Sequence, residues 1–127
     1  RLAALTLVIA IPACADETIS GYAYPAATYR LVQIDDVPYS ARATISFPEQ
    51  GVAQGDAPCN IWSAAQTAPY PWFALEPIAA TARACEDMDA EHAFFTALAE
   101  MTLVEVQGAV LILSNDAGRE MEFRAAE

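Results

Sequence analysis

Apolar and polar side chains alternate along several short stretches of this chain, with the period of two that is typical of half-buried β-strands. In residues 28–34 (TYRLVQI), Tyr29 and Leu31 lie on one face, and Arg30 and Val32 lie on the other. Comparable runs predict further extended segments at residues 43–47, 52–54, 72–75, 78–82, 102–106, 109–113 and 119–124. Because the runs are short and follow one another closely, the sequence predicts a mostly antiparallel sheet.

Turn-forming residues separate the expected strands. Asp35-Asp36 follows the first strand, and Gln107-Gly108 divides two β-rich runs in the manner of a β-hairpin. Residues 114–118 (SNDAG) form another expected turn. Residues 63–71 contain two prolines and are expected to be a loop.

A different period marks one principal helix. Phe94, Leu98 and Met101 recur at intervals of four and three residues, so that they form a single apolar stripe. Asp87 or Asp89 can cap its first turn by accepting backbone hydrogen bonds. The acidic side chains that complement the positive end of the helix dipole are Glu86, Asp87, Asp89 and Glu91. The sequence therefore predicts an α+β fold, with a sheet of short strands packed on one helix.

The first fifteen residues have the pattern of a targeting segment. The apolar run from Leu2 to Ile11 is too short to span a bilayer as a helix but suits the apolar region of a signal peptide. Cleavage after Ala15 would release a soluble protein. Alternatively, residues 11–14 (IPAC) resemble a bacterial lipobox, and lipidation of Cys14 would anchor the chain in the envelope.

The lipid-anchored form is favoured, although proline is unusual at the position of Pro12. A buried N-terminal helix is the structural alternative, and Pro12 would end it early. Either processing route predicts export, to the periplasm or to the envelope membrane. Residues 16–27 are small and polar and are expected to form a flexible tether, and residues 28–124 then form a single domain.

Three cysteines sharpen this picture. If Cys14 is lipidated or removed, Cys59 and Cys85 remain as an even pair in an exported domain, which favours a disulfide. The alternative is two buried free thiols that never meet.

The charge of the chain limits its partners. Six arginines oppose 17 acidic residues, and the net charge is -11. Such a chain has no electrostatic reason to approach nucleic acid or an anionic lipid surface, so contact with a membrane is expected only through the lipid anchor. Residues 86–91 (EDMDAE) superficially resemble a calcium loop but lack its central glycine, and a helix-capping turn is preferred.

The candidate catalytic groups are few. His92 is the single histidine, and no G-x-S-x-G setting or phosphate-binding glycine loop accompanies it. A dyad of Cys59 or Cys85 with His92 is the catalytic alternative, which a disulfide would abolish. One histidine and two cysteines fall short of a zinc site unless a carboxylate joins them. We therefore expect a protein that is not an enzyme and holds no metal or cofactor.

An aromatic group offers the best candidate interaction surface. Trp62, Tyr70 and Trp72 lie close together in the sequence, and aromatic side chains are enriched at binding hot spots. They are also frequent in strand cores, which is the alternative.

The order of several motifs resembles the META domain, the HslJ-like family of bacterial envelope proteins. These motifs are Gly55…Cys59-Asn60, Thr81-x-x-x-Cys85, Glu91-x-x-Phe94-x-x-x-Leu98, Leu111-x-Leu113 and Gly118…Phe123. The resemblance implies a compact α+β fold with a curved antiparallel sheet on a helix. It also implies export, commonly as a lipoprotein, and a link to stress tolerance without an established enzymatic activity.

Carried over by position, the family motif falls on Cys59, Asn60, Thr81 and Cys85. The sequence departs from the family pattern at Pro58, where glycine is frequent, and at Ile61, where a basic residue is common. No ligand role is therefore carried over to this loop, and Asn60 can equally cap a turn.

Three functions are compatible with these features. The first is a non-enzymatic envelope protein that binds another protein or a small molecule. The second is an inhibitor or assembly partner of another envelope protein. The third is a thiol-dependent redox protein that uses Cys59 and Cys85.

Overall fold

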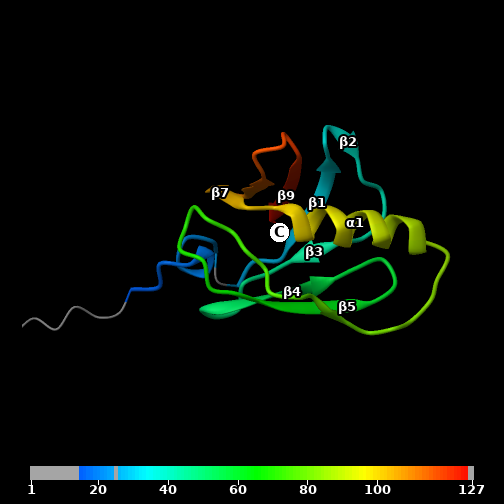
Figure 1. Ribbon diagram of the computed structural model, residues 1–127, viewed down its shortest axis with the longest axis horizontal. Helices are drawn as coiled ribbons and strands as arrows, with labels where there is room; N and C mark the ends of the chain where they lie inside the picture. Colours follow the sequence, from blue (N-terminus) through cyan, green and yellow to red (C-terminus); the bar gives the residue numbers. More distant parts are fainter. Residues whose placement is uncertain (1–14, 25, 126–127) are drawn as a thin grey trace, which may run out of the picture.

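The computed structural model describes residues 15–24 and 26–125. Over these residues the chain forms two antiparallel sheets and one long helix, the α+β fold that the sequence predicts (Figure 1). The larger sheet contains β1 (Tyr29–Ile34), β2 (Val37–Pro38), β3 (Thr44–Ile45), β7 (Leu103–Gln107), β8 (Val110–Ser114) and β9 (Glu120–Ala125). The smaller sheet contains β4 (Gly51–Asp56), β5 (Ile61–Gln66) and β6 (Ala79–Ala80).

The larger sheet has the order β2-β1-β9-β8-β7, and β3 pairs with the start of β1. An isolated bridge between Ser46 and Gln54 connects the end of β3 to β4, so that the two sheets meet. Gly55 makes this approach feasible, because a Cβ atom there would lie 2.0 Å from the carbonyl oxygen of Thr44. β4 can therefore cross β3 only with glycine at this position.

Helix α1 (Met88–Glu100) lies between the two sheets (Figure 1), and the side chains of its apolar stripe are part of the core. Phe94 and Leu98 are fully buried on this stripe, as their spacing predicts, and Met101 ends the helix with an extended backbone. The sheet side chains in the same core are Tyr29, Leu31, Ile45, Ala53, Trp62, Val104, Leu111, Leu113, Met121 and Phe123. No helix in the described ranges is long and apolar enough to cross a membrane.

The region after Asn60 differs from its sequence-based prediction. Residues 61–66 form strand β5, although residues 63–71 were expected to be a loop. Its segment Ser63-Ala64-Ala65-Gln66 carries little apolar periodicity, and complete pairing with β4 makes it a strand. The expected strand at residues 72–75 is reduced to isolated bridges, Trp72 with Leu103 and Leu75 with Gln66.

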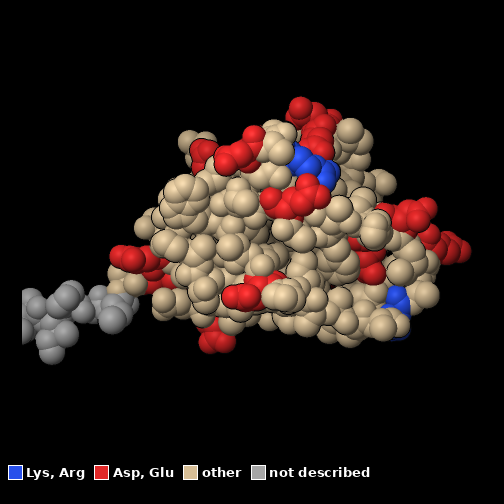
Figure 2. Space-filling model, viewed as in Figure 1, with Lys and Arg blue, Asp and Glu red and all other residues tan. Residues whose placement is uncertain are grey.

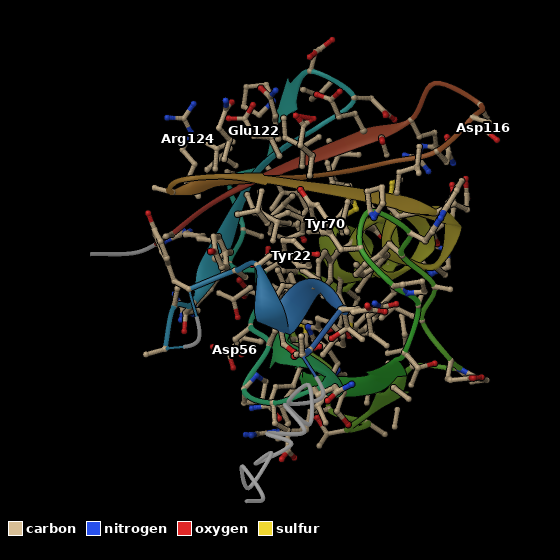
Figure 3. All side chains as sticks on the ribbon, turned by 90° about the vertical axis from the view of Figure 1, so that its left-hand side faces the viewer. Tyr22, Asp56, Tyr70, Asp116, Glu122 and Arg124 are labelled. Atoms are coloured by element: carbon tan, nitrogen blue, oxygen red, sulfur yellow. A yellow bond between two sulfur atoms is a disulfide. The ribbon has the colours of Figure 1, made fainter. Side chains whose placement is uncertain are left out.

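The residues before β1 are packed against the domain. A short 3-10 helix, η1 (Ile19–Gly21), buries Ile19, and the backbone N–H of Tyr70 donates to the carbonyl of Glu17 at 2.6 Å. The ring of Tyr22 stacks on Tyr70 at 4.1 Å between centroids (Figure 3). This arrangement differs from the flexible tether expected at residues 16–27. The expected signal peptide and Cys14 lie outside the described residues.

Candidate functional site

A disulfide joins Cys59 and Cys85, with 5.5 Å between their Cα atoms. It links the turn between β4 and β5 to the irregular segment that precedes α1. The two cysteines are 26 residues apart, and closing such a loop stabilises a fold by about 3–4 kcal/mol on the chain-entropy model. The structure thus contains the pairing expected for an exported domain.

Asn60 is buried beside this disulfide, and its amide group uses its full hydrogen-bonding capacity. Its Nδ2 atom donates to Glu91 Oε2 at 2.7 Å and to the carbonyl of Arg83 at 2.9 Å. Its Oδ1 atom accepts from the Thr81 hydroxyl at 2.8 Å and from the Arg83 N–H at 2.6 Å. Asn60 therefore connects its own turn to residues 81–83 and to helix α1.

Glu91 is only 4% exposed, whereas the sequence placed it among the acidic side chains of a helix-capping turn. Its second carboxylate oxygen, Oε1, accepts the backbone N–H of Cys59 at 3.0 Å. A buried carboxylate is tolerable when both oxygens are hydrogen-bonded. Its spacing gave a signal: Glu91 precedes Phe94 by three residues and Leu98 by seven, and so continues the buried stripe.

The structure brings all four residues of the expected family motif together, with Glu91 as a fifth member. Thr81 completes the set, since its hydroxyl donates to Asn60 and accepts the Ile61 N–H at 3.2 Å. We call this set the motif corner; it consists of Cys59, Asn60, Thr81, Cys85 and Glu91.

Tyr39 braces the start of α1 next to the motif corner. Its hydroxyl donates to the carbonyl of Ala90 at 2.7 Å. Partial burial, and then the negative charges of Glu91 and Asp87, raise the pKa of Tyr39 to about 12. The phenol is therefore a neutral donor at physiological pH.

A concave surface lies directly against the motif corner. A cavity of about 650 Å³ covers the outer face of β4, β5 and β6, and a second cavity of about 300 Å³ adjoins it. The two share Arg42, Asp56, Ile61 and Thr81. We call them together the β4–β5 groove; its other polar lining residues are Thr28, Thr44, Ser46, Gln54, Asn60, Ser63 and Arg83.

The aromatic residues expected to form an interaction surface do not act together. Trp62 is 3% exposed; its indole N–H donates to the carbonyl of Thr44 at 3.2 Å, and its ring meets Phe94 edge-on at 6.0 Å. Trp62 is thus a core residue, which is the alternative that the sequence left open. Tyr70 is half-buried, whereas Trp72 is 58% exposed.

His92 is not a member of the motif corner. It is exposed on α1 and lines two shallow cavities of about 340 Å³ each, on either side of the helix, together with Thr96. The structure places it in neither cavity of the β4–β5 groove. Among the residues described, no group of three or more His, Cys, Asp or Glu side chains could hold a metal ion.

The acidic start of α1 is only partly as expected. Asp87 occupies the N-cap position, but its side chain makes no capping hydrogen bond. Asp89 and Glu91 lie in the first turn, where negative charge favours the helix dipole.

An α+β domain with this motif corner matches one family. The family model of the META domain matches residues 23–127, and the chain belongs to this family. No curated protein matches the chain.

Solved structures share the fold. An NMR structure of a protein from Burkholderia xenovorans is 18% identical, with a TM-score of 0.61, and the match covers 88% of this chain and 83% of that one. A crystal structure of a DUF4847 family protein from Bacteroides vulgatus is 10% identical, with a TM-score of 0.65, over 84% of this chain and 96% of that one. At these identities the likeness concerns the fold alone.

Proposed function

We propose that this chain is an exported META-domain protein of the bacterial cell envelope, which binds a partner or a small molecule without turnover and contributes to stress tolerance. The β4–β5 groove is the observation that carries the proposal, because a concave surface of this size lies against a rigid, cross-linked corner. Ligand sites are typically concave and largely pre-formed, with a few fixed polar groups.

The disulfide supports the proposed location in the cell envelope. Disulfides persist in oxidising compartments such as the periplasm and are rare in the cytosol. The apolar run of residues 2–11 gives the chain a means of export, and Cys14 gives it a means of lipid anchoring.

The proposed location can be tested by the intact mass of the native protein, recovered from envelope and soluble fractions. We expect an envelope species that begins at a lipidated Cys14 and gains a pair of hydrogens on reduction. A soluble species that begins at Asp16 and carries the same disulfide would retain export and remove the anchor. A cytosolic species with an unprocessed leader and two free thiols would contradict the proposal.

A bulky substitution in the groove tests the binding role. Ser63 is exposed on β5 and lines the groove, so Ser63→Trp should block it. Ser40 is also exposed but lies outside the groove, and Ser40→Trp is the matched control. In a strain that lacks the gene, the Ser40 variant should restore growth under heat stress and the Ser63 variant should not. Full rescue by a stably folded Ser63→Trp protein would exclude the groove.

A role as an inhibitor or assembly partner is the second candidate, and a different surface favours it. Trp72 and Tyr22 are both more than half exposed, and Tyr22 stacks on Tyr70 (Figure 3). Exposed aromatic side chains are typical anchors of protein interfaces. Trp72→Ser should then abolish the capture of one specific envelope protein, whereas Ser63→Trp should leave it unchanged.

The thiol-dependent alternative requires a reactive thiolate. In the structure both sulfur atoms are bonded to each other, and His92 lines different cavities. Alkylation of the native, unreduced protein separates the two ideas: modification of Cys59 or Cys85 under these conditions would favour thiol chemistry over the binding role.

A further inference from the structure

We propose that the β4–β5 groove recognises an oxyanion, a carboxylate or a phosphate, at the end formed by Arg83 and Arg42. This inference rests on the proposed function, in which the groove is the binding surface, and it adds the chemical class of the ligand.

The distribution of charge is the first observation. On the face shown in Figure 2, acidic side chains are scattered over the surface, whereas basic side chains occupy few places. Two of the chain's six arginines, Arg42 and Arg83, line the groove, and a single acidic residue, Asp56, accompanies them. The lining therefore carries a net positive charge in a chain whose total is -11.

Arg83 is the key cation, because within the described residues it makes no ion pair. By contrast, Arg119 contacts Asp35 and Glu100, and Arg124 contacts Glu122. A guanidinium group has five N–H donors in a planar fork that matches carboxylate and phosphate oxygens. Those donors are available at Arg83.

The backbone of Arg83 is held unusually well for an irregular segment. Both its N–H and its carbonyl bond to the buried amide of Asn60, and the disulfide fixes Cys85 two residues later. Asn60 is in turn fixed by Glu91. The side chain of Arg83 therefore projects from a rigid point, so that less conformational entropy is lost when a ligand binds.

Arg42 supplies a second cation, because its ion pair with Asp56 does not engage its whole guanidinium group. Its Nε and Nη2 atoms both donate to Asp56 Oδ2, at 3.3 and 3.2 Å, and Nη1 makes no contact with that carboxylate within the bonding distances. Next to this end, the exposed side chains of Ile61, Ser63 and Gln54 line the wall of the groove.

Titration of isotope-labelled protein with inorganic phosphate, and separately with acetate, tests the proposal by NMR. We expect saturable shifts of the Arg83 and Arg42 side-chain signals and of the Thr81 amide. Arg83→Gln should weaken binding by about tenfold or more, which corresponds to the loss of a charge-assisted hydrogen bond. Arg83→Lys keeps the charge but loses the fork, and should recover only part of the affinity.

Arg30 provides the matched control. It is also exposed, also lacks an ion pair within the described residues, and lies on β1 without lining either cavity of the groove. Arg30→Gln changes the net charge by the same amount as Arg83→Gln and should leave binding unchanged. Equal losses in the two variants, or shifts that never saturate, would overturn the proposal, since they would show only general screening.

Two further measurements are needed. Vesicle binding distinguishes a lipid headgroup from a free anion, and growth assays distinguish failure of the oxyanion site from failure of the proposed function. Co-sedimentation with phosphatidylglycerol vesicles that depends on Arg83 would assign a lipid headgroup; phosphate binding without vesicle binding would assign a free anion, which the charge of -11 favours. If Arg83→Gln restores growth under heat stress and Ser63→Trp does not, the groove functions but the oxyanion site is wrong. If both variants restore growth, the proposed function fails as well.

Discussion

The motif corner and the helix–sheet core stabilise the same molecule by different means. In the core, Phe94, Leu98 and Phe123 are fully buried among other apolar side chains. In the motif corner, Asn60 and Glu91 are nearly as buried, but their contacts are hydrogen bonds with defined donors and acceptors. The core is therefore sensitive to volume, whereas the corner is sensitive to the chemistry of single atoms.

This contrast explains why the groove lies where it does. An apolar core holds helices and strands together through buried apolar area, and it tolerates changes of side chain that keep its volume. A network in which one amide makes four hydrogen bonds holds the Thr81 hydroxyl and the backbone of Arg83 in place at the rim of the groove. The polar corner thus provides position, and the apolar core provides most of the stability.

The largest effect is expected from the core. Phe94→Ala removes a fully buried ring that contacts Trp62 and Phe95, and should lower the free energy of unfolding by about 3–5 kcal/mol. Chemical denaturation with reduced and oxidised samples measures it. Phe95→Ala is the control, because Phe95 is only half-buried on the same helix and its loss should cost clearly less. Equal costs would mean that the stripe does not carry the core.

The next effect concerns the covalent link of the corner. Replacing both cysteines, Cys59→Ser with Cys85→Ser, should cost about 3–4 kcal/mol if the chain-entropy account holds. Denaturant unfolding of the double variant against the oxidised parent measures this difference. The hydrogen bonds of Asn60 and Glu91 should survive in the variant at low denaturant, so protection of the backbone amides at position 59 and at Arg83 should persist. Loss of that protection would show that the network depends on the disulfide.

The fold could be predicted in outline because its signals are local. Alternation placed β1, β7, β8 and β9 within one or two residues of their observed bounds, and the four-and-three spacing placed α1. The prediction was less accurate where strand pairing, rather than the alternation of apolar and polar side chains, determines the structure. β1 shows this within a single strand, since a register shift between Leu31 and Gln33 ends the alternation that its first residues follow.

The site was less predictable because its chemistry is non-local. Asn60 and Glu91 are 31 residues apart, and no spacing rule joins a turn asparagine to a helical glutamate. Negative charge at the start of a helix complements the helix dipole, so Glu91 was grouped with its acidic neighbours. Its position on the apolar stripe was the one local signal of burial. Trp62, likewise, was grouped by sequence proximity with Tyr70 and Trp72, although its strand turns it into the core.

A smaller effect is expected when a hydrogen bond of the motif corner is removed and its disulfide is kept. Glu91→Gln keeps the shape of the side chain, but an amide can accept from only one of the two donors that the carboxylate satisfies. One buried donor then loses its partner, at a cost of about 1–3 kcal/mol. Thermal unfolding and hydrogen exchange at the Cys59 amide measure it. Asp89→Asn, in the same helical turn but exposed, should be nearly neutral; an equal cost there would assign the effect to the helix dipole.

The smallest effect is a dependence on pH that connects the two regions through Tyr39. Burial, Glu91 and Asp87 raise the pKa of this phenol to about 12, above the ordinary value of 10.0 that it regains on unfolding. A group whose pKa is raised by folding stabilises the protein fully below its unfolded pKa, so this contribution should be present at pH 7 and lost between about pH 10 and pH 12. Tyr39→Phe should flatten the fall in stability over that range, as followed by alkaline denaturation.

In Glu91→Gln one facing charge is absent, so the tyrosinate absorbance assigned to Tyr39 should appear at lower pH than in the parent, whereas Asp89→Asn should not move it. An unchanged titration in Glu91→Gln would mean that burial alone raises the pKa, and that the carboxylate of the motif corner does not act electrostatically on the start of the helix.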